Sequence, residues 1–160
     1  MAEVSGVDRD YNLWVLLHQV SDIIFNAREA ELQEHGFPAT QAEVLFVIKA
    51  IGDKVTPAQI SRMMFRRPHS VSGIIERMKK AGLVKKTKDL HRKNLVRVTI
   101  TEKGQQAYKQ ALKRKSVQKI MSALSEAERQ KLKSLLEMLR NKGLKELGID
   151  PKKAPPPKFV

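Results

Sequence analysis

The sequence predicts a mainly helical fold that carries one small β-hairpin. Its 160 residues suit a single domain, because a chain of about 150 residues already buries roughly 70% of its unfolded surface. Apolar side chains recur at the helical period over most of the chain, whereas clear alternation occurs at residues 95–100. Capping residues, glycines and prolines divide the periodic stretches into separate helices.

The first two helices are expected at residues 8–34 and 39–51. The first has helically spaced apolar residues and no Pro or Gly until Gly36, which suits a C-cap. The second, "ATQAEVLFVIKAIG", has a broad apolar face, with Thr40 as a candidate N-cap and Gly52 at its end. We expect this second helix to be buried.

A helix-turn-helix follows, because each of its two helices has a start signal. Thr56 can accept hydrogen bonds from free backbone N–H groups, and Pro57 suits the first position of a helix over residues 57–64. Pro68 opens the second helix, residues 68–81, and a tight turn around "FRR" joins the two. On the second helix one apolar stripe should face the core, formed by Val71, Ile74, Ile75, Met78 and Gly82.

Two β-prone segments, "LVKKTK" and "LVRVTI", predict a hairpin with the polar loop "DLHRKN". Thr101 should cap one helix through residues 101–125, and Ser125 with Glu128 forms a capping box for a last helix. The Pro-rich, basic residues 148–160 should form an extended tail. A helix-turn-helix followed by such a hairpin is a winged helix-turn-helix.

Positive charge is concentrated around the helix-turn-helix. Residues 62–114 hold 16 Lys and Arg but 3 Asp and Glu, in a chain whose net charge is +14. This concentration indicates a surface that meets a polyanion such as nucleic acid. The alternative is a basic protein that binds any nucleic acid without sequence preference. With 2 Tyr, 5 Phe and 1 Trp, the chain offers no platform for stacking single-stranded bases.

The outward side of residues 68–81 is short or polar in its first turns, which favours close approach to the major groove of double-stranded DNA. We expect the recognition surface to consist of His69, Ser70, Ser72, Gly73 and Arg77. The DNA backbone should be contacted by Arg62, Arg66, Arg67, Lys80, Lys85 and Lys86. Gly73 would give clearance for the groove; its alternative role is that of a packing glycine.

The tip of the hairpin adds a second basic surface. His91, Arg92 and Lys93 are expected to reach the adjacent minor groove, where negative potential is strongest in narrow A·T tracts. A solvated turn is the alternative, in particular for His91.

No catalytic residue, cofactor or metal site is predicted, and we do not expect an enzyme. The chain has no Cys, its four His are scattered, and it has neither a Gly-rich phosphate loop nor a His-Glu-x-x-His motif. No apolar run reaches the about 20 residues of a membrane span, and the N-terminus does not resemble a signal peptide. We therefore expect a cytoplasmic protein with no membrane association.

The order of these features resembles the MarR family of bacterial transcription regulators over residues from about 10 to 147. The matching segments are "ATQAEVLFVI", "TPAQISRMMFRRPHSVSGIIERMKKAGLVKK" and "KDLHRKNLVRVTITEKG". In the last, Ile100, Thr101 and Gly104 match the family's Leu-Thr-x-x-Gly helix start. The resemblance implies a homodimer with interlocking terminal helices, a recognition helix in the major groove and often a small aromatic or phenolic effector.

The wing departs from the family pattern. The family commonly has Asp-x-x-Asp-Arg-Arg, but here Arg92 replaces the second Asp and Asn94 the second Arg. Many members also carry a long polar or basic side chain where this chain has Gly73.

The predicted domain spans residues 8–147, with a DNA-binding lobe at about 39–100 and dimerisation helices at about 8–35 and 101–147. The terminal helices hold more apolar residues than one small core needs, which favours a homodimer over packing within one chain. These residues are Trp14, Leu17, Ile24, Ile120, Leu124, Leu132, Leu135, Leu139, Leu144 and Leu147. Two-fold symmetry predicts a pseudo-palindromic operator with half-sites about 10 bp apart.

We expect a repressor that occupies its promoter and is released by a small effector. The candidate effector residues are Trp14, His18, Arg28 and Phe46, which would line a cleft between the dimerisation helices and the lobe. For each of them, ordinary packing is the alternative.

Overall fold

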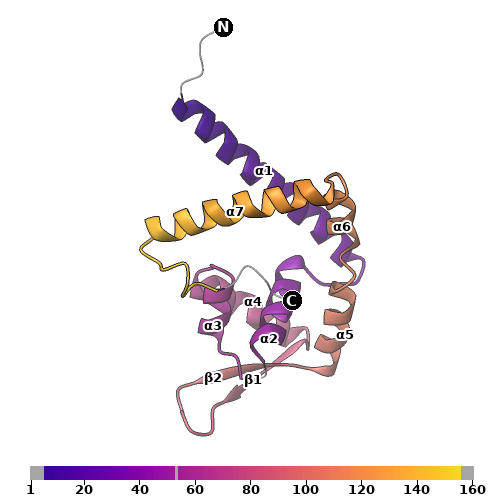
Figure 1. Cartoon of the computed structure of the whole chain (residues 1–160). Coiled ribbons are helices and arrows are strands. Elements are labelled where there is room, and N and C mark those ends of the chain that lie inside the picture. The colour runs from indigo at the N-terminus through magenta and orange to yellow at the C-terminus, as the bar shows by residue number, and fades with distance from the viewer. Residues whose placement is uncertain (1–5, 53, 156–160) are drawn as a thin grey trace.

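The computed structural model describes residues 6–52 and 54–155, which form seven α-helices and one antiparallel pair of strands (Figure 1). The elements are α1 (Gly6–Gln33), α2 (Ala39–Ile51), α3 (Pro57–Met63), α4 (Pro68–Lys80), β1 (Val84–Lys88), β2 (Val96–Ile100), α5 (Glu102–Ala111), α6 (Lys115–Met121) and α7 (Glu126–Glu146). The predicted mainly helical fold with one hairpin is confirmed. In Figure 1, α1 projects away from the lobe that contains α2–α4 and the hairpin, and α7 passes in front of α1 in this view.

The core of the lobe lies between α2, α4 and the hairpin, with α3 and α5 packed around them. As its composition predicts, α2 is buried along most of its length. The loop before α3 is fixed to the hairpin, because the Val98 N–H donates to the Val55 carbonyl at 2.9 Å and the two residues form a β-bridge. Both side chains are fully buried.

Three helix starts that the sequence predicts are confirmed. The hydroxyls of Thr56, Thr101 and Ser125 each accept a hydrogen bond from the N–H three residues later, at 3.3, 3.0 and 3.2 Å. The side-chain oxygens of Gln59 and Glu128 in turn accept the N–H groups of Thr56 and Ser125. Both helix starts are therefore capping boxes. In each case the partners are near neighbours in sequence.

The start of α2 differs from the prediction that Thr40 caps it. The helix already begins at Ala39, so Thr40 lies inside the first turn, and no side chain at the N-cap position, Pro38, makes a capping bond. Instead, the Glu29 carboxylate of α1 accepts the Ala39 N–H at 2.6 Å. The cap therefore comes from another helix.

The prediction of one helix over residues 101–125 is wrong. The chain bends after α5, with Arg114 in the left-handed region at φ 47°, and α6 begins at the next residue. The physical reason is again α1, since Arg28 donates to the Ala111 carbonyl at the end of α5 and Glu31 accepts N–H bonds at the start of α6.

The predicted extended tail is also wrong for the described residues 150–155. The Asp150 carboxylate and carbonyl accept N–H bonds from residues two to four positions later, so that the chain turns. Arg140 of α7 donates to the Pro155 carbonyl, which ties this turn to the helix. The rest of the predicted tail, residues 156–160, lies outside the described residues.

Candidate nucleic-acid interface

The turn between α3 and α4 fixes the start of α4. Phe65 has a left-handed φ of 50°. The buried Ser61 hydroxyl donates to the Arg66 carbonyl at 2.6 Å, and the Arg66 N–H donates back to the Ser61 carbonyl at 3.1 Å. No side chain caps α4 at Arg67, and Pro68 occupies its first turn. The first N–H groups of α4 therefore keep their capacity to bind an anion.

One side of α4 is buried and the other is exposed. The buried residues are Val71, Ile74, Ile75 and Met78, which confirms the predicted stripe for these four. The prediction that Gly82 belongs to the stripe is wrong, because this residue is exposed and lies beyond the end of the helix, at φ 75°. Of the predicted recognition residues, His69, Ser70, Ser72 and Arg77 are exposed and Gly73 is half-buried.

Gly73 is not needed for packing inside the chain. A Cβ at this position would meet, within 4 Å, a terminal nitrogen of the flexible Arg77 side chain at 3.5 Å, an ordinary contact. At Gly104, in contrast, a Cβ would lie 2.1 Å from the Leu83 carbonyl oxygen. Packing thus explains Gly104 but not Gly73.

The start of α4 borders a hollow of about 340 Å³. Its lining combines recognition residues with residues of α2 and the turn: Thr40, Arg66, His69, Ser70, Gly73, Ile74 and Arg77. The two guanidinium groups and two hydroxyls that line this hollow suit an anionic, hydrogen-bonding partner.

The six predicted backbone-binding residues fall into two groups. Arg62, Arg67, Lys80 and Lys85 are exposed with no acidic partner among the ion pairs of the described residues. Arg66 pairs with Glu43 of α2 at 3.3 Å, and Lys86 pairs with Glu76 of α4. The hydrogen bond from Lys86 holds the pKa of Glu76 below its usual range. This second ion pair ties β1 to α4.

The wing is the β1–β2 hairpin, paired from Val84 with Ile100 to Lys88 with Val96. Its tip is exposed at the three predicted residues, His91, Arg92 and Lys93.

Asp89 organises this tip. Its carboxylate accepts the N–H groups of His91 at 2.9 Å and Arg92 at 3.0 Å, and the Arg97 Nε at 3.0 Å. The bond from the His91 N–H, followed by that from Arg97, lowers the pKa of Asp89 to about 2. Asp89 is therefore ionised at neutral pH, and the tip has a defined shape.

Sequence reasoning missed three wing residues. Asp89 has a local signal, because an Asp that bonds the N–H groups two and three residues later forms a common turn. Arg97 has no such local signal, because one of its partners, the Lys54 carbonyl, is 43 residues away in the sequence. Leu90 is 94% exposed at the tip, between Asp89 and the three predicted residues.

The four predicted effector residues do not come together. Trp14 and His18 are exposed on α1, where the Trp14 ring lies 5.5 Å from Tyr11 and 5.8 Å from His18 between ring centroids. Arg28 is engaged at the α5–α6 bend. Phe46 is buried in the core of the lobe. Within one chain, the N-terminal half of α1, which carries Trp14 and His18, extends away from the lobe (Figure 1).

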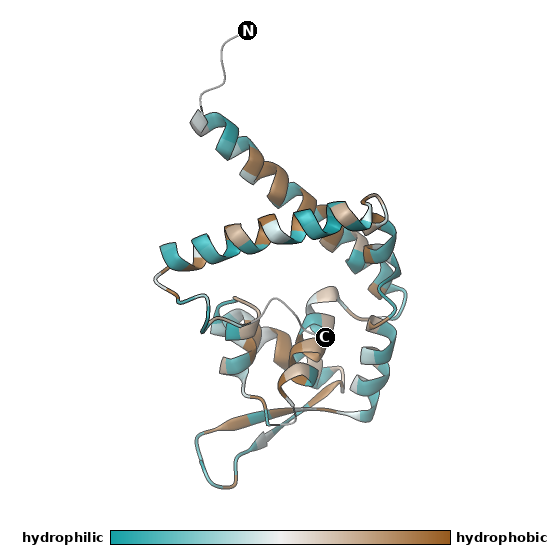
Figure 2. Ribbon diagram, viewed as in Figure 1, coloured by the Kyte–Doolittle hydropathy of each residue, from teal (hydrophilic) through white to brown (hydrophobic). Residues whose placement is uncertain are grey.

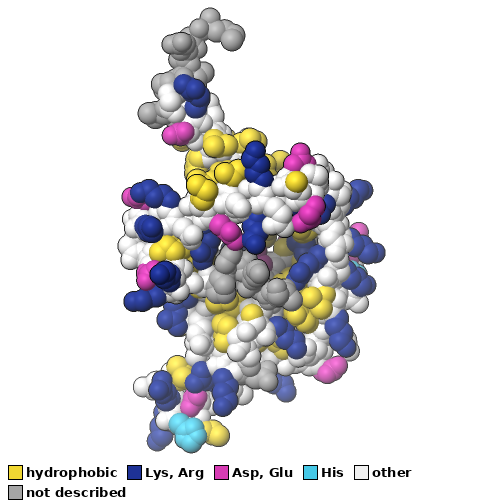
Figure 3. Space-filling model, viewed as in Figure 1, with side chains coloured by type: hydrophobic (Ala, Val, Ile, Leu, Met, Phe, Trp, Pro, Cys, Tyr) yellow, Lys and Arg dark blue, Asp and Glu magenta, His cyan; other side chains and the backbone are white. Residues whose placement is uncertain are grey.

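The terminal helices expose much of their apolar surface. On α1 the exposed residues include Tyr11, Leu13, Trp14, Leu16, Val20 and Ile23, and on α7 Leu135, Leu136, Met138 and Leu139. In Figure 2 a hydrophobic stretch runs along α1, and Figure 3 shows hydrophobic side chains gathered there, at the opposite end from the basic side chains of the wing. Leu144 is the one buried residue of α7.

No helix in the described ranges is long and apolar enough to cross a membrane.

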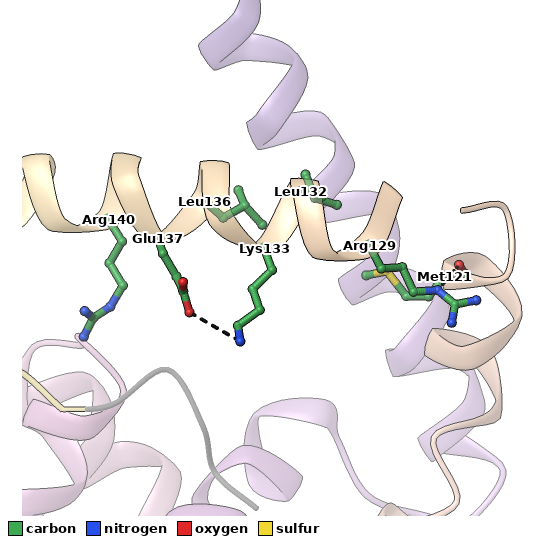
Figure 4. Close-up of a pocket in the computed structure, with 7 residues that line it drawn as sticks. All are labelled: Met121, Arg129, Leu132, Lys133, Leu136, Glu137 and Arg140. Atoms are coloured by element: carbon green, nitrogen blue, oxygen red, sulfur yellow. Dashed lines mark hydrogen bonds and ion pairs between the residues drawn. The ribbon is translucent and has the colours of Figure 1, made fainter. Parts of the chain in front are cut away.

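A cavity of about 510 Å³ lies along α7. Figure 4 shows Lys133, Glu137 and Arg140 pointing from α7 toward the lobe, with the Lys133 Nζ 3.9 Å from a Glu137 carboxylate oxygen. Leu132 and Leu136 line the same cavity, and Met121 and Arg129 complete it at the α6 end. The cavity therefore combines apolar and charged side chains.

The fold and the interface define a winged helix-turn-helix protein. A model of the MarR family matches residues 35–93. The chain is 31% identical to the organohalide-sensing transcriptional regulator RdhR-CbdbA1625 in its 2,4-dichlorophenol-bound form, with a TM-score of 0.86 over 100% of this chain and 96% of that one. No curated protein matches the chain.

Two further solved structures share the fold at lower identity. A mutant of MarR from E. coli complexed with operator DNA is 20% identical, with a TM-score of 0.77 over 84% of this chain and 98% of that chain. Bordetella bronchiseptica BpsR, whose DNA binding is regulated by 6-hydroxynicotinic acid, is 21% identical, with a TM-score of 0.73 over 81% of this chain and 98% of that chain. The chain belongs to the MarR family, whose members are winged-helix DNA-binding transcription regulators.

Proposed function

We propose that this protein is a homodimeric repressor that binds a pseudo-palindromic operator in double-stranded DNA. The observation that carries the proposal is the outward side of α4, which presents His69, Ser70 and Ser72 beside a glycine that packing does not require. Short polar residues in the first turns allow a helix to enter the major groove and hydrogen-bond base edges. Four exposed cations around this surface are available to the phosphates: Arg62, Arg67, Lys80 and Lys85.

The wing extends this interface in the proposal. Arg92 and Lys93 are exposed at a tip whose shape Asp89 maintains, so their charges are available to an adjacent minor groove. Because Arg66 and Lys86 have acidic partners of their own, we assign them a smaller share of phosphate binding than the sequence suggested.

The homodimer is supported by the exposed apolar surface of α1 and α7. In the proposed dimer, residues at about 39–100 of each chain bind DNA, and residues at about 8–35 and 101–147 form the interface between the chains. A second copy is the occupant that suits such a surface, because two identical apolar surfaces related by two-fold symmetry can cover each other. Two recognition helices in a dimer then read half-sites about 10 bp apart.

We further propose a small aromatic effector that releases the protein from DNA. The support comes from relatives: RdhR-CbdbA1625 binds 2,4-dichlorophenol, and BpsR responds to 6-hydroxynicotinic acid. Trp14 and His18 remain candidates for a site completed by the partner chain, because both are exposed on α1. Arg28 and Phe46 already have partners within the chain.

The decisive experiment compares the affinity of the purified protein for the DNA upstream of its own gene and for random duplex of equal length, at one fixed salt concentration. We expect the upstream DNA to bind more tightly by about three orders of magnitude or more. Equal affinities would instead support the alternative, a basic protein that binds nucleic acid without sequence preference.

A further inference from the structure

Two neighbouring side chains of α1 contact the backbone on either side of the bend between α5 and α6. Arg28 donates through Nη2 to the carbonyl of Ala111, the last residue of α5. Glu31 accepts the N–H of Lys115 at 2.8 Å with one carboxylate oxygen and that of Ser116 at 3.1 Å with the other. These two side chains thus satisfy backbone groups at the end of α5 and at the start of α6.

The local sequence contains no cause for this bend. Residues 105–124 include neither Pro nor Gly, and no side chain within the segment caps α6. Arg114 nevertheless takes a left-handed conformation, with φ 47°, which is unfavourable for a residue with a Cβ. Contacts from other parts of the chain are therefore the natural source of stabilisation for this conformation.

The Arg28 and Glu31 side chains are largely buried and form an ion pair with each other. Arg28 and Glu31 have side chains that are 12% and 15% exposed, and Arg28 Nη1 lies 3.0 Å from a Glu31 oxygen. Burial raises the pKa of Glu31, but hydrogen bonds from Ser116, Lys115 and Arg28 outweigh it and bring the pKa to about 2. The carboxylate is charged at neutral pH, which strengthens each bond that it accepts.

The bend is also packed against the lobe. The Arg114 guanidinium lies 4.7 Å from the centre of the Phe46 ring in α2, and the Tyr108 ring of α5 meets Phe46 edge-on at 5.4 Å. The position of α6 is consequently defined relative to both α1 and α2.

We propose that Arg28 and Glu31 are positioning residues that hold the α5–α6 bend and thereby set the half-site spacing that the dimer reads. The second part rests on the proposed function. α5 leaves the lobe directly after β2, whereas α6 leads into α7, so the angle between them places each recognition helix relative to the dimerisation surface. A change in this angle changes the separation of the two recognition helices, and half-site spacing follows from that separation.

The first test measures the bend itself. The chain has no Cys, so cysteines introduced at the exposed residues Lys109 in α5 and Lys119 in α6 provide unique sites for a pair of spin labels. Labelled chains are diluted with unlabelled ones, and the distance within one chain is measured by electron paramagnetic resonance. We expect a single narrow distance in the parent and a longer, broader distribution in Glu31→Ala and Arg28→Ala.

Glu29→Ala is the matched control. Glu29 lies on the same helix and also caps a helix by accepting a backbone N–H, but that helix is α2. We expect the label distance to stay unchanged in this variant. If Glu31→Ala keeps the parent distance, or if Glu29→Ala changes it equally, the pair does not hold the bend. Glu31→Gln, which retains one acceptor oxygen, provides a milder variant should Glu31→Ala fail to fold.

The second test uses duplexes in which the operator half-sites are moved closer or farther apart by one or two base pairs. We expect the parent and Glu29→Ala to prefer the native spacing, and Glu31→Ala to lose about tenfold of that preference. An altered label distance with an unchanged spacing preference would overturn the functional half of the proposal. If the parent prefers no sequence at all, the proposed function fails, while the label distances still decide the role of the pair in the bend.

Discussion

The lobe and the terminal helices use their apolar residues in opposite ways. In the lobe, α2 and α4 bury theirs within the chain, and residues such as Leu45 and Ile75 are fully inaccessible. On α1 and α7, in contrast, large side chains such as Trp14 and Leu139 are more than half exposed. The lobe therefore has a core of its own, whereas the terminal helices expose an apolar surface that a second copy would cover in the dimer that we propose. Substitutions in the two regions should therefore disrupt different properties of the protein.

Truncation in the core of the lobe should have the largest effect on folding. Leu45→Ala removes a fully buried side chain and should lower the free energy of unfolding by about 2–5 kcal/mol. Urea denaturation monitored by circular dichroism measures this loss. The same truncation at Leu139 should change the unfolding free energy of a monomeric sample far less, and an equal loss at both sites would contradict the distinction between the two regions.

A charge in the exposed apolar surface of α7 should break the dimer. Leu139→Glu places one carboxylate on each side of a two-fold interface, and we expect the dimer dissociation constant to rise by about 100-fold. Sedimentation velocity at several concentrations reports the change. Lys131→Glu, a charge change at another exposed position of the same helix, is the control and should leave the dimer intact.

Substitutions on α4 should separate base reading from charge. Ser70→Ala or His69→Ala should cost about 1–3 kcal/mol of binding free energy on the operator and little on random duplex. Lys85→Ala should weaken both complexes alike, because a phosphate contact carries no sequence information. Fluorescence anisotropy at fixed salt measures all of these affinities. Equal losses of Ser70→Ala on both duplexes would remove this residue from the recognition surface.

The α5–α6 bend should be sensitive to acid. The pKa of Glu31 is about 2 in the folded chain against an ordinary value of 4.5, so its contribution to stability is complete above about pH 4.5. That contribution is lost as the pH falls from about 4.5 toward 2. The difference in unfolding free energy between the parent and Glu31→Gln should therefore shrink over this interval. A difference that stays constant with pH would show that the Glu31 charge does not stabilise the fold.

Two glycines should respond in opposite directions to the addition of a methyl group. Gly104→Ala should destabilise the lobe by about 1–3 kcal/mol, because its Cβ would collide with the Leu83 carbonyl. Gly73→Ala should instead stabilise α4 by up to about 1 kcal/mol while weakening operator binding. Thermal unfolding and operator titration of both variants test this pair. A destabilised Gly73→Ala would restore the packing role for Gly73.

Most of the helix-turn-helix and the wing could be predicted because their signals are local. Thr56 and Pro57 mark the start of α3, and the alternation of residues 95–100 marks β2. The candidate DNA surface follows from the helical period once α4 is known. The internal partners of Arg66 and Lys86 were not predictable, since each lies on another element and nothing in the spacing identifies it.

The sequence by itself determined the order of the elements, the buried stripe of α4 and the concentration of positive charge around it. These depend on helical periodicity, on caps that act over three residues and on composition. Only the tertiary structure decided where α2 begins, where α5 ends and what Arg28 does. In each of these cases a side chain of α1 meets a backbone group that is 10 to 85 residues away, and such a contact exists only after the helices have packed.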